Sequence, residues 1–544
     1  MNTRHLSLKT FQTGLFLILI FLFALFFAER ISFVTADLGR HIKNGEVFAE
    51  THTILSTNYY SYTESNFPAI NHHWGTGVVF YYLWKLWGFV GVSYFYITLV
   101  TLSFVLIFFI ARRNAGFLLV SLFSLLALPL IGDRTELRPE GFSYLFIAIY
   151  YGILLWYSSR EIRLKWIIWS LPVLQVLWVN LHIFFIFGPF LIGVFLMDCF
   201  IRKAGTDKRN ELLFVFLLSC VVCVLNPQGL KGALVPLTIF KEYGYMLVEN
   251  QSVWFMQKRF PGNMIYTHFW ICLGVLILGI VLGIRKNNFK QLFVPVVCGM
   301  CFAVLGMKAI RGFPLFGFFF MICGSQVYQQ WMDRRNNVAR TIMTGGILLV
   351  VIGILGLITV ERTGYYSLYR RLRLPLTMPE IQKKRVWFPH MIRNVGKLPG
   401  LVPGANRSAE FFKRLNLKGP IFNNYDIGGY LIFHLFPQER VFVDNRPEAY
   451  STAFFQKQYI PMQEDEAVWK KFDQQYRFNV IYFYRLDLTP WAQPFLIRRL
   501  EDPLWAPVYV DDFTIILLKR NAENEAVIQQ LELPKSIFQV RHEG

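Results

Sequence analysis

The sequence has little charge and lacks the loops by which many soluble enzymes bind nucleotides. Only 17% of its 544 residues are charged, whereas 54% are hydrophobic. Ordinary soluble domains carry about 25% charge. Neither a Walker A motif nor a complete GxGxxG motif is present, so neither type of phosphate-binding loop is predicted. A composition this apolar indicates a polytopic membrane protein.

Cysteine is scarce, and its positions exclude a disulfide framework. All seven cysteines lie within apolar segments, and two pairs have CxxC spacing, Cys220/Cys223 and Cys298/Cys301. On a hydrophobic helix such a pair packs as small apolar side chains more often than it binds metal or transfers electrons. We therefore predict neither a redox site nor a zinc site from cysteine.

The formal net charge of +20 does not indicate a nucleic-acid partner, because the cations lie in short connectors between apolar runs. Every second connector is basic, which under the positive-inside rule places these connectors and the N-terminus in the cytoplasm. The basic connectors contain Arg112/Arg113, Arg160/Arg163/Lys165, Arg202/Lys203/Lys208/Arg209, Arg285/Lys286/Lys290 and Arg334/Arg335/Arg340.

Hydropathy predicts about eleven membrane-spanning helices. The expected spans are 14–34, 90–110, 116–131, 142–157, 166–179, 183–201, 211–225, 268–284, 291–306, 313–330 and 341–360. The first resembles a signal peptide, but no small-residue cleavage site follows, so we interpret it as an uncleaved span. The aromatic segment 74–88, interrupted by Lys85, favours an interfacial or re-entrant helix. An odd number of spans leaves the C-terminal residues outside the cell.

Two domains are therefore expected. Residues 1–360 form an α-helical membrane domain with a large external loop at 35–89, and residues 361–544 form an extracytoplasmic α/β domain. In the second domain, residues 419–450 are expected to form a strand, a glycine-assisted turn, a short helix and a second strand that ends at residue 443. Apolar runs at 478–485, 507–512 and 513–520 follow, separated by helical stretches such as 464–476. Asp444, Arg446 and Glu448 follow one expected strand end, where open α/β sheets tend to bind ligands.

Polar residues gather at the external ends of the spans. Asp37, Arg40 and His41 share one face if the segment after the first span is helical; interfacial anchoring is the alternative. The same loop contains several tyrosines and the pair His72/His73. Aromatic faces beside polar groups suit a sugar. The histidine pair is a candidate for binding a divalent metal ion, because imidazole is a common ligand. Against this, adjacent side chains point in opposite directions in an extended chain.

Further candidates lie in later external loops. Arg134 and Arg138 in "GDRTELRPEG" present forks that match phosphate oxygens, or they form ion pairs within a solvated turn. Lys308 and Arg311 provide a second anion clamp, with snorkelling as the alternative. The remaining candidates for substrate binding are Asn180, His182 and Glu249.

The order of several segments gives the chain a resemblance to a known superfamily. These are "ADLGRHIKNGE", "YYSYTESNFPAINHHWG", "RTELRPEGFSYLF", "WVNLHIFF", "LNPQGL", "AIRGFPLF" and "FNNYDIGGYLIFHLFPQERVFVDNRPEAY". Together they resemble the GT-C superfamily of polytopic glycosyltransferases, and especially the bacterial group with a C-terminal soluble domain. The resemblance implies location in the inner membrane, a lipid-phosphate-linked sugar donor, and an acidic residue in the first external loop. Asp37 occupies that place, but Leu38 follows it where the superfamily often has a second acid.

The expected function is transfer of a sugar from a polyprenyl-phosphate donor to a glycan, lipid or protein acceptor outside the cell. Cytoplasmic connectors are too short for a nucleotide-sugar-binding domain, so the sugar must arrive on a lipid. In this hypothesis Asp37 is the general base, Arg134, Arg138 and Arg311 hold the leaving phosphate, and the histidines orient hydroxyl groups. The alternatives are a transporter or flippase for a lipid-linked substrate, and an envelope assembly factor without catalysis.

Overall fold

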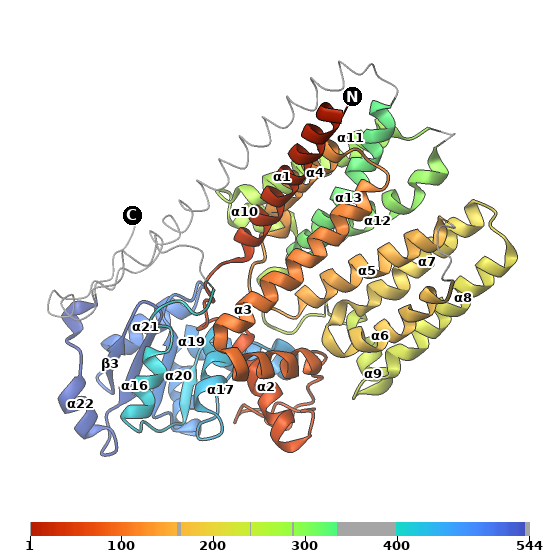
Figure 1. Cartoon of the computed structure of the whole chain (residues 1–544). Helices are drawn as coiled ribbons and strands as arrows, with labels where there is room; N and C mark the ends of the chain where they lie inside the picture. The colour runs from red at the N-terminus through yellow and green to blue at the C-terminus, as the bar shows by residue number, and fades with distance from the viewer. Residues whose placement is uncertain (1, 160–164, 240, 286–287, 334–398, 539–544) are drawn as a thin grey trace. The chain divides into compact units, whose positions relative to one another are not determined.

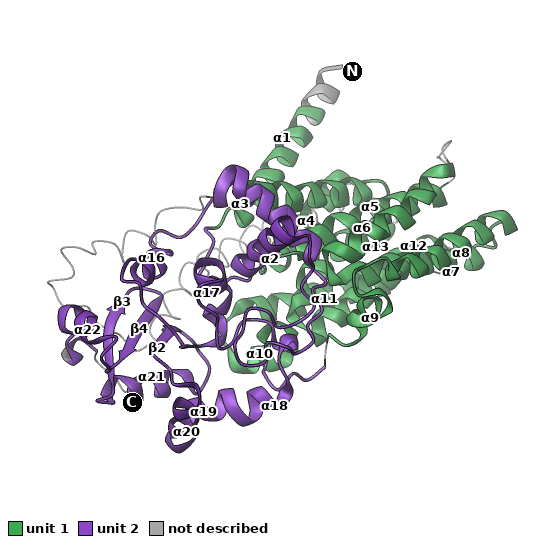
Figure 2. Ribbon diagram, turned by 90° about the horizontal axis from the view of Figure 1, so that it is seen from below, with its two compact units in different colours: residues 1–29, 94–240, 247–368 green, residues 30–93, 241–246, 369–544 purple. Residues whose placement is uncertain are grey.

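The computed structural model describes residues 2–159, 165–239, 241–285, 288–333 and 399–538. The chain divides into two compact units (Figures 1 and 2). The helical unit comprises Met1–Glu29, Tyr94–Phe240 and Leu247–Leu368, and the mixed unit comprises Arg30–Ser93, Lys241–Met246 and Tyr369–Gly544. The expected boundary near residue 361 lies outside the described residues. The first external loop, which we had expected to belong with residues 1–360, belongs to the mixed unit together with the C-terminal residues.

The helical unit is built from apolar helices. They are α1 (Asn2–Phe27), the later part of α3 (Trp74–Arg112), α4 (Phe117–Ile131), α5 (Glu140–Ser158), α6 (Ser170–Leu181), α7 (Phe187–Ile201), α8 (Thr206–Val221), α9 (Gly229–Leu234), α10 (Val253–Arg259), α11 (Met264–Gly283), α12 (Phe289–Lys308) and α13 (Phe313–Met332).

Seven described helices are long and apolar enough to cross a membrane. An eighth span exists if Thr206–Val224 and Gly229–Leu237, bent by 116°, count as one. Two further apolar helices, Phe117–Ile131 and Trp166–Leu181, are shorter. The membrane character is thus supported, whereas the count of eleven is not confirmed, and the expected span 341–360 lies outside the described residues. The first helix ends at Phe27, earlier than the expected end at residue 34.

Helix α13 forms the centre of the helical unit, where it packs against α4, α11 and α12. All its residues from Phe313 to Val327 are buried, as expected for a helix surrounded by other helices. Phe316, Phe319 and Phe320 are fully buried, and Phe319 stacks on Phe302 of α12 with ring centroids 4.4 Å apart. This packing holds the beginning of α13, next to Arg311, in a fixed position.

The segment 74–88 is helical and continues into the following apolar span as α3. A kink separates the two parts at Gly88, whose φ of +62° is unfavourable for other residues. The two segments that we expected to be separate, 74–88 and 90–110, are thus separated by a kink within α3 and not by a loop.

The mixed unit contains a four-stranded sheet in the order β1-β2-β4-β3. The strands are β1 (Ile421–Asn423), β2 (Val480–Tyr484), β3 (Trp505–Val510) and β4 (Thr514–Lys519), with β1 parallel to β2 and the other pairs antiparallel. The helices of this unit are α2 (Leu38–Thr51), the beginning of α3, α16 (Arg407–Arg414), α17 (Gly428–Leu435), α18 (Thr452–Phe454), α19 (Ile460–Glu464), α20 (Glu466–Tyr476), α21 (Ala492–Glu501) and α22 (Glu525–Leu531). The expected small α/β domain is thus present.

The expected strand at 441–443 is not part of the sheet. Val441 instead forms an isolated parallel bridge with Ser61 of the first external loop. The amide of Val441 donates to the carbonyl of Tyr60 at 3.1 Å, and its carbonyl accepts from the amide of Tyr62 at 3.2 Å. The strand prediction was wrong because these backbone groups bond to a segment almost 400 residues earlier in the chain.

Candidate functional site

Asp37 stands at the beginning of α2, shortly after the first apolar helix. It is the N-cap residue, yet its carboxylate makes no capping hydrogen bond to α2. Arg40 Nη2 lies 3.7 Å from Asp37 Oδ1, and the two side chains are 8% and 18% exposed. A negative charge at a helix N-terminus is favourable. The predicted helix and the shared face of Asp37 and Arg40 are confirmed, and the carboxylate is not used to cap the helix.

Two close glycine contacts position α2 within the mixed unit. A Cβ atom on Gly39 would lie 2.7 Å from the carbonyl oxygen of Gly429 in α17, and one on Gly45 would lie 2.1 Å from that of Gly77 in α3. Only glycine permits backbones to approach so closely. Figure 1 shows α2 beside α17. Both contacts hold the helix that follows Asp37 against distant parts of the chain.

The packing of α2 on α3 brings three histidines together. The ring centroids of His41 and His73 are 5.6 Å apart, and those of His72 and His73 are 3.9 Å apart. His72 Nδ1 lies 3.2 Å from the carbonyl oxygen of Ile70. Three of the predicted substrate-binding residues therefore lie close together, and their binding role stays a prediction. No three His, Cys, Asp or Glu residues converge as a metal site within the described ranges, and metal dependence stays untested.

His72 and His73 line a small pocket of the mixed unit. The polar residues of its lining are Arg40, Asn44, Asn71, His72, His73, Arg446 and Glu448. The pocket therefore combines guanidinium, imidazole, amide and carboxyl groups, which are the polar groups that bind sugar hydroxyls.

Arg446 is held rigidly at this pocket by a buried ion pair. Its Nε donates to Asp444 Oδ1 at 2.8 Å and its Nη2 to Asp444 Oδ2 at 2.7 Å. The same Nη2 donates to Asn58 Oδ1 at 3.0 Å, and the guanidinium lies over the ring of Tyr60. Tyr60 donates its hydroxyl to Asn44 at 2.8 Å. The C-terminal segment and the first external loop are therefore joined through one network.

The sequence reasoning had placed Arg446 and Glu448 at a separate ligand site of the C-terminal domain. In the structure they line the same pocket as Arg40 and His72. The run of polar residues after the apolar stretch 441–443 was a usable signal for a binding segment. Its proximity to Asp37 could not be inferred, because no local pattern connects segments so distant in sequence.

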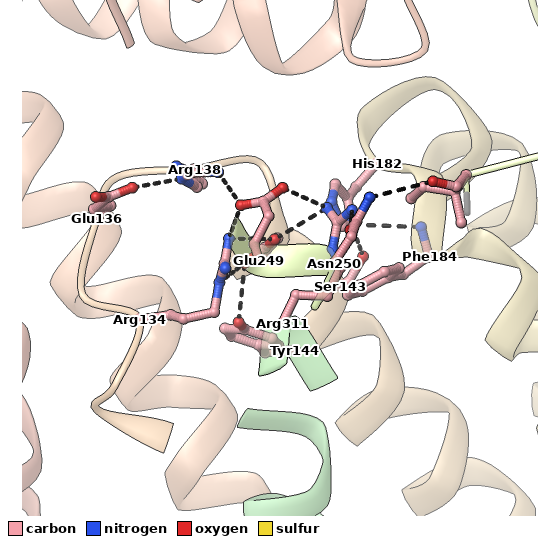
Figure 3. A network of polar contacts seen from close by, with 12 residues as sticks. Arg134, Glu136, Arg138, Ser143, Tyr144, His182, Phe184, Glu249, Asn250 and Arg311 are labelled. Atoms are coloured by element: carbon pink, nitrogen blue, oxygen red, sulfur yellow. Dashed lines mark hydrogen bonds and ion pairs between the residues drawn. The ribbon is translucent and has the colours of Figure 1, made fainter. Parts of the chain in front are cut away.

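A second polar network lies in the helical unit (Figure 3). Arg134 binds Glu140 through two parallel hydrogen bonds of 3.0 Å. Glu249 accepts from Arg134 at 2.9 Å and from Arg138 at 2.6 Å. Arg311 Nη2 lies 3.5 Å from a carboxylate oxygen of both Glu140 and Glu249. Three separate loops of this unit are therefore held together by charge-assisted hydrogen bonds.

The charges of this network offset one another. Three arginines, Arg134, Arg138 and Arg311, face Glu136, Glu140 and Glu249. Burial alone would raise the pKa of Glu249, but Arg138, Arg311 and Arg134 outweigh it and hold this pKa well below its usual value of 4.5. The charge of Arg138 likewise lowers the pKa of Glu136. A phosphate would have to compete with these carboxylates, so phosphate binding by the arginines stays a prediction.

The remaining predicted residues of the helical unit have local partners or none. Asn180 Nδ2 donates to the carbonyl oxygens of Val176 and Leu225 at 2.8 and 2.9 Å. His182 Nδ1 accepts from the hydroxyl of Ser143 at 2.7 Å and from a backbone amide. These contacts connect the end of α6 to residues about 40 positions away, and substrate binding by Asn180 and His182 stays a prediction. Lys308 is exposed at the end of α12 and makes no hydrogen bond or ion pair within the described ranges.

Sequence reasoning did not identify Glu140. It is the first residue of α5, is buried, and binds both Arg134 and Arg311. An acid in the first turn of an apolar helix, close to two arginines in sequence, was an available signal for a buried ion pair.

Comparisons with known proteins give one informative likeness. No protein-family model and no curated protein matches the sequence. Among solved structures, the chain is similar to the archaeal oligosaccharyltransferase AglB from Archaeoglobus fulgidus, whose structure contains an inhibitory peptide and a dolichol-phosphate. The TM-score is 0.56 at 9% identity, and the match covers 97% of this chain and 77% of that chain. The chain shares its fold with a membrane oligosaccharyltransferase. At this identity the likeness concerns the fold alone.

Proposed function

We propose that the protein is a membrane glycosyltransferase that moves a sugar from a polyprenyl-phosphate donor to an acceptor on the extracytoplasmic face. The observation that carries this proposal is the pocket beside Asp37. The Asp37 carboxylate does not cap its own helix and lies 3.7 Å from Arg40. Arg40 lines a pocket together with His72 and His73, and we call this the Asp37 pocket although Asp37 adjoins it only through Arg40. The fold shared with an oligosaccharyltransferase supports the same reaction class.

A lipid-linked donor fits the short connectors that we assign to the cytoplasm. Residues 113–116 separate α3 from α4, and residues 202–205 separate α7 from α8. Neither segment can hold a domain that binds a nucleotide sugar. The similar oligosaccharyltransferase was solved with a dolichol-phosphate, which is a polyprenyl-type lipid phosphate. A donor of this class reaches an external site through the membrane.

In the proposed reaction Asp37 acts as the general base. The acceptor hydroxyl attacks the anomeric carbon of the sugar, and its proton passes to the Asp37 carboxylate. The bond between the anomeric carbon and the phosphate oxygen breaks, and polyprenyl phosphate leaves with the electron pair. General-base assistance of this kind contributes about 10²–10⁴-fold. His41, His72, His73 and Arg40 would orient the hydroxyl groups.

The test is incubation of the purified protein in lipid with a panel of polyprenyl-phosphate sugars and candidate acceptors. Mass spectrometry would measure released polyprenyl phosphate and glycosylated acceptor. We expect one donor to yield both products in equal amounts. Movement of the donor between leaflets of a vesicle without release of lipid phosphate would instead indicate a flippase. Binding of partner proteins without either process would indicate an assembly factor.

A further inference from the structure

Glu448 lies in the middle of a segment that is fixed at both ends. At its beginning, Asp444 accepts from Arg446, and Arg446 donates to Asn58 of the first external loop. At its end, Ser451 donates its amide and its hydroxyl to the carboxylate of Glu64 at 2.7 and 2.8 Å. Both anchors are in the first external loop. The backbone that carries Glu448 is therefore held against the same loop that contains His72 and His73.

The close packing of α17 fixes this segment from another side. A Cβ atom on Gly428 would lie 2.4 Å from the Cα of Asp444. The neighbouring Gly429 is in contact with Gly39 of α2. Through these two glycines, α17 packs against both the segment that carries Glu448 and the helix α2 that follows Asp37.

The Glu448 carboxyl group differs from other acids of the mixed unit because it has no structural partner. It makes no hydrogen bond and no ion pair with another of the residues that the structure describes, although it lines the pocket with Arg40 and Arg446. In contrast, Asp444 binds Arg446, Glu64 binds Ser451, and Glu439 accepts from the amide of Gly419. The Glu448 side chain is half-buried, and a carboxyl group that lines a pocket without bonding to another described residue can take a ligand as its partner.

The electrostatic environment agrees with this geometry. Burial raises the pKa of Glu448, and the charge of Arg40 opposes this shift only in part. Burial also raises the pKa of the Tyr425 hydroxyl, and the charges of Glu448 and Asp37 add to the increase. Both carboxylates therefore act on the same phenol group. A carboxyl group with a raised pKa can donate as well as accept a hydrogen bond.

We propose that Glu448 is a substrate-contacting residue of the Asp37 pocket, and that its carboxyl group binds hydroxyl groups of the sugar. This inference rests on the proposed function. It assigns a role to the C-terminal segment, which completes a site that begins on the first external loop. The sequence places Leu38 and not a second acid beside Asp37, and the fold supplies the second carboxyl group from a residue some 400 positions later.

The test compares three variants of the full-length protein in lipid. Glu448→Ala removes the carboxyl group, and Glu448→Gln keeps a group that donates and accepts. Glu439→Gln is the matched control, because Glu439 is also a partly buried acid of the mixed unit with a raised pKa but does not line the pocket. Two quantities are measured for each: binding of a short-chain polyprenyl-phosphate hexose by calorimetry, and sugar transfer with the donor that the wild type uses.

We expect Glu448→Ala to weaken binding or turnover by about 10- to 100-fold, the effect of losing one or two hydrogen bonds to a buried group. Glu448→Gln should recover part of this loss and should flatten the pH dependence, whereas Glu439→Gln should match the wild type. Unchanged binding and turnover in Glu448→Ala would overturn the inference. If the wild type binds the donor without transferring sugar, the proposed function fails, and the binding data still decide the role of Glu448. A wild type that binds no donor overturns both.

Discussion

The two units each contain a cluster of charged residues, and the clusters differ in how completely their charges are paired. In the helical unit, Arg134 and Glu249 are both hydrogen bonded to oppositely charged partners. In the mixed unit, Arg446 is equally well paired, whereas Arg40 makes longer contacts, 3.7 Å to Asp37 and 3.4 Å to Asn445, and Glu448 bonds to no other described residue. The first cluster has the properties of a structural clamp. The second combines a rigid frame with more loosely held polar groups that line a pocket, as a binding site requires.

The largest effect on stability is expected from breaking the rigid frame of the pocket. Asp444 is fully buried, and Asp444→Ala would leave the Arg446 guanidinium without its bidentate partner. Removal of one member of a buried ion pair costs about 3–5 kcal/mol. Reversible unfolding in detergent–lipid micelles should show a lower free energy of unfolding for the mixed unit. Stability equal to that of the wild type would mean that the pair does not support the pocket.

A smaller effect is expected from the clamp of the helical unit. Glu249→Gln weakens charged hydrogen bonds from Arg134 and Arg138, at a cost of about 1.5–3 kcal/mol. Because the pKa of Glu249 is held below its unfolded value, its stabilisation is present above about pH 4.5 and is lost as the pH falls through the folded pKa. The free energy of unfolding, measured from pH 7 down to pH 3, should therefore fall less steeply in the variant than in the wild type. Equal dependence of stability on pH in the variant and the wild type would contradict a stabilising role of Glu249.

The close approach of α2 to α17 in the mixed unit depends on glycine. Gly39→Ala would place a methyl group 2.7 Å from the carbonyl oxygen of Gly429, which should destabilise the mixed unit by about 1–3 kcal/mol. Gly14→Ala is the matched control, because a Cβ at Gly14 in α1 meets nothing within 4 Å. The control should be neutral or slightly stabilising, since alanine favours helices. Equal effects of both substitutions on thermal unfolding would refute a special role for the α2–α17 contact.

Features that depend on local periodicity were predictable from the sequence. The apolar helices, the shared face of Asp37 and Arg40, and strands β2 and β4 follow from residue patterns within one segment.

Features that depend on distant contacts were not predictable. The run 441–443 has the composition of a strand, yet it bonds to Tyr60 and Tyr62 instead of entering the sheet. Arg138 was predicted as an external cation, but its partner Glu249 is more than 100 residues away. Neither contact leaves a trace in a single sequence, because each is set by the packing of whole elements.

The central claim, that chemistry takes place at Asp37, is tested most directly by sugar transfer in Asp37→Asn. Asparagine preserves the shape of the Asp37 side chain and removes a charge that lies 3.7 Å from Arg40, so the thermal unfolding midpoint should fall only slightly, as expected for one loosely paired charge. Loss of the base should lower the rate by about 10²–10⁴-fold, with donor binding retained. A variant that folds normally and transfers sugar within about threefold of the wild-type rate, well outside that range, would contradict the account.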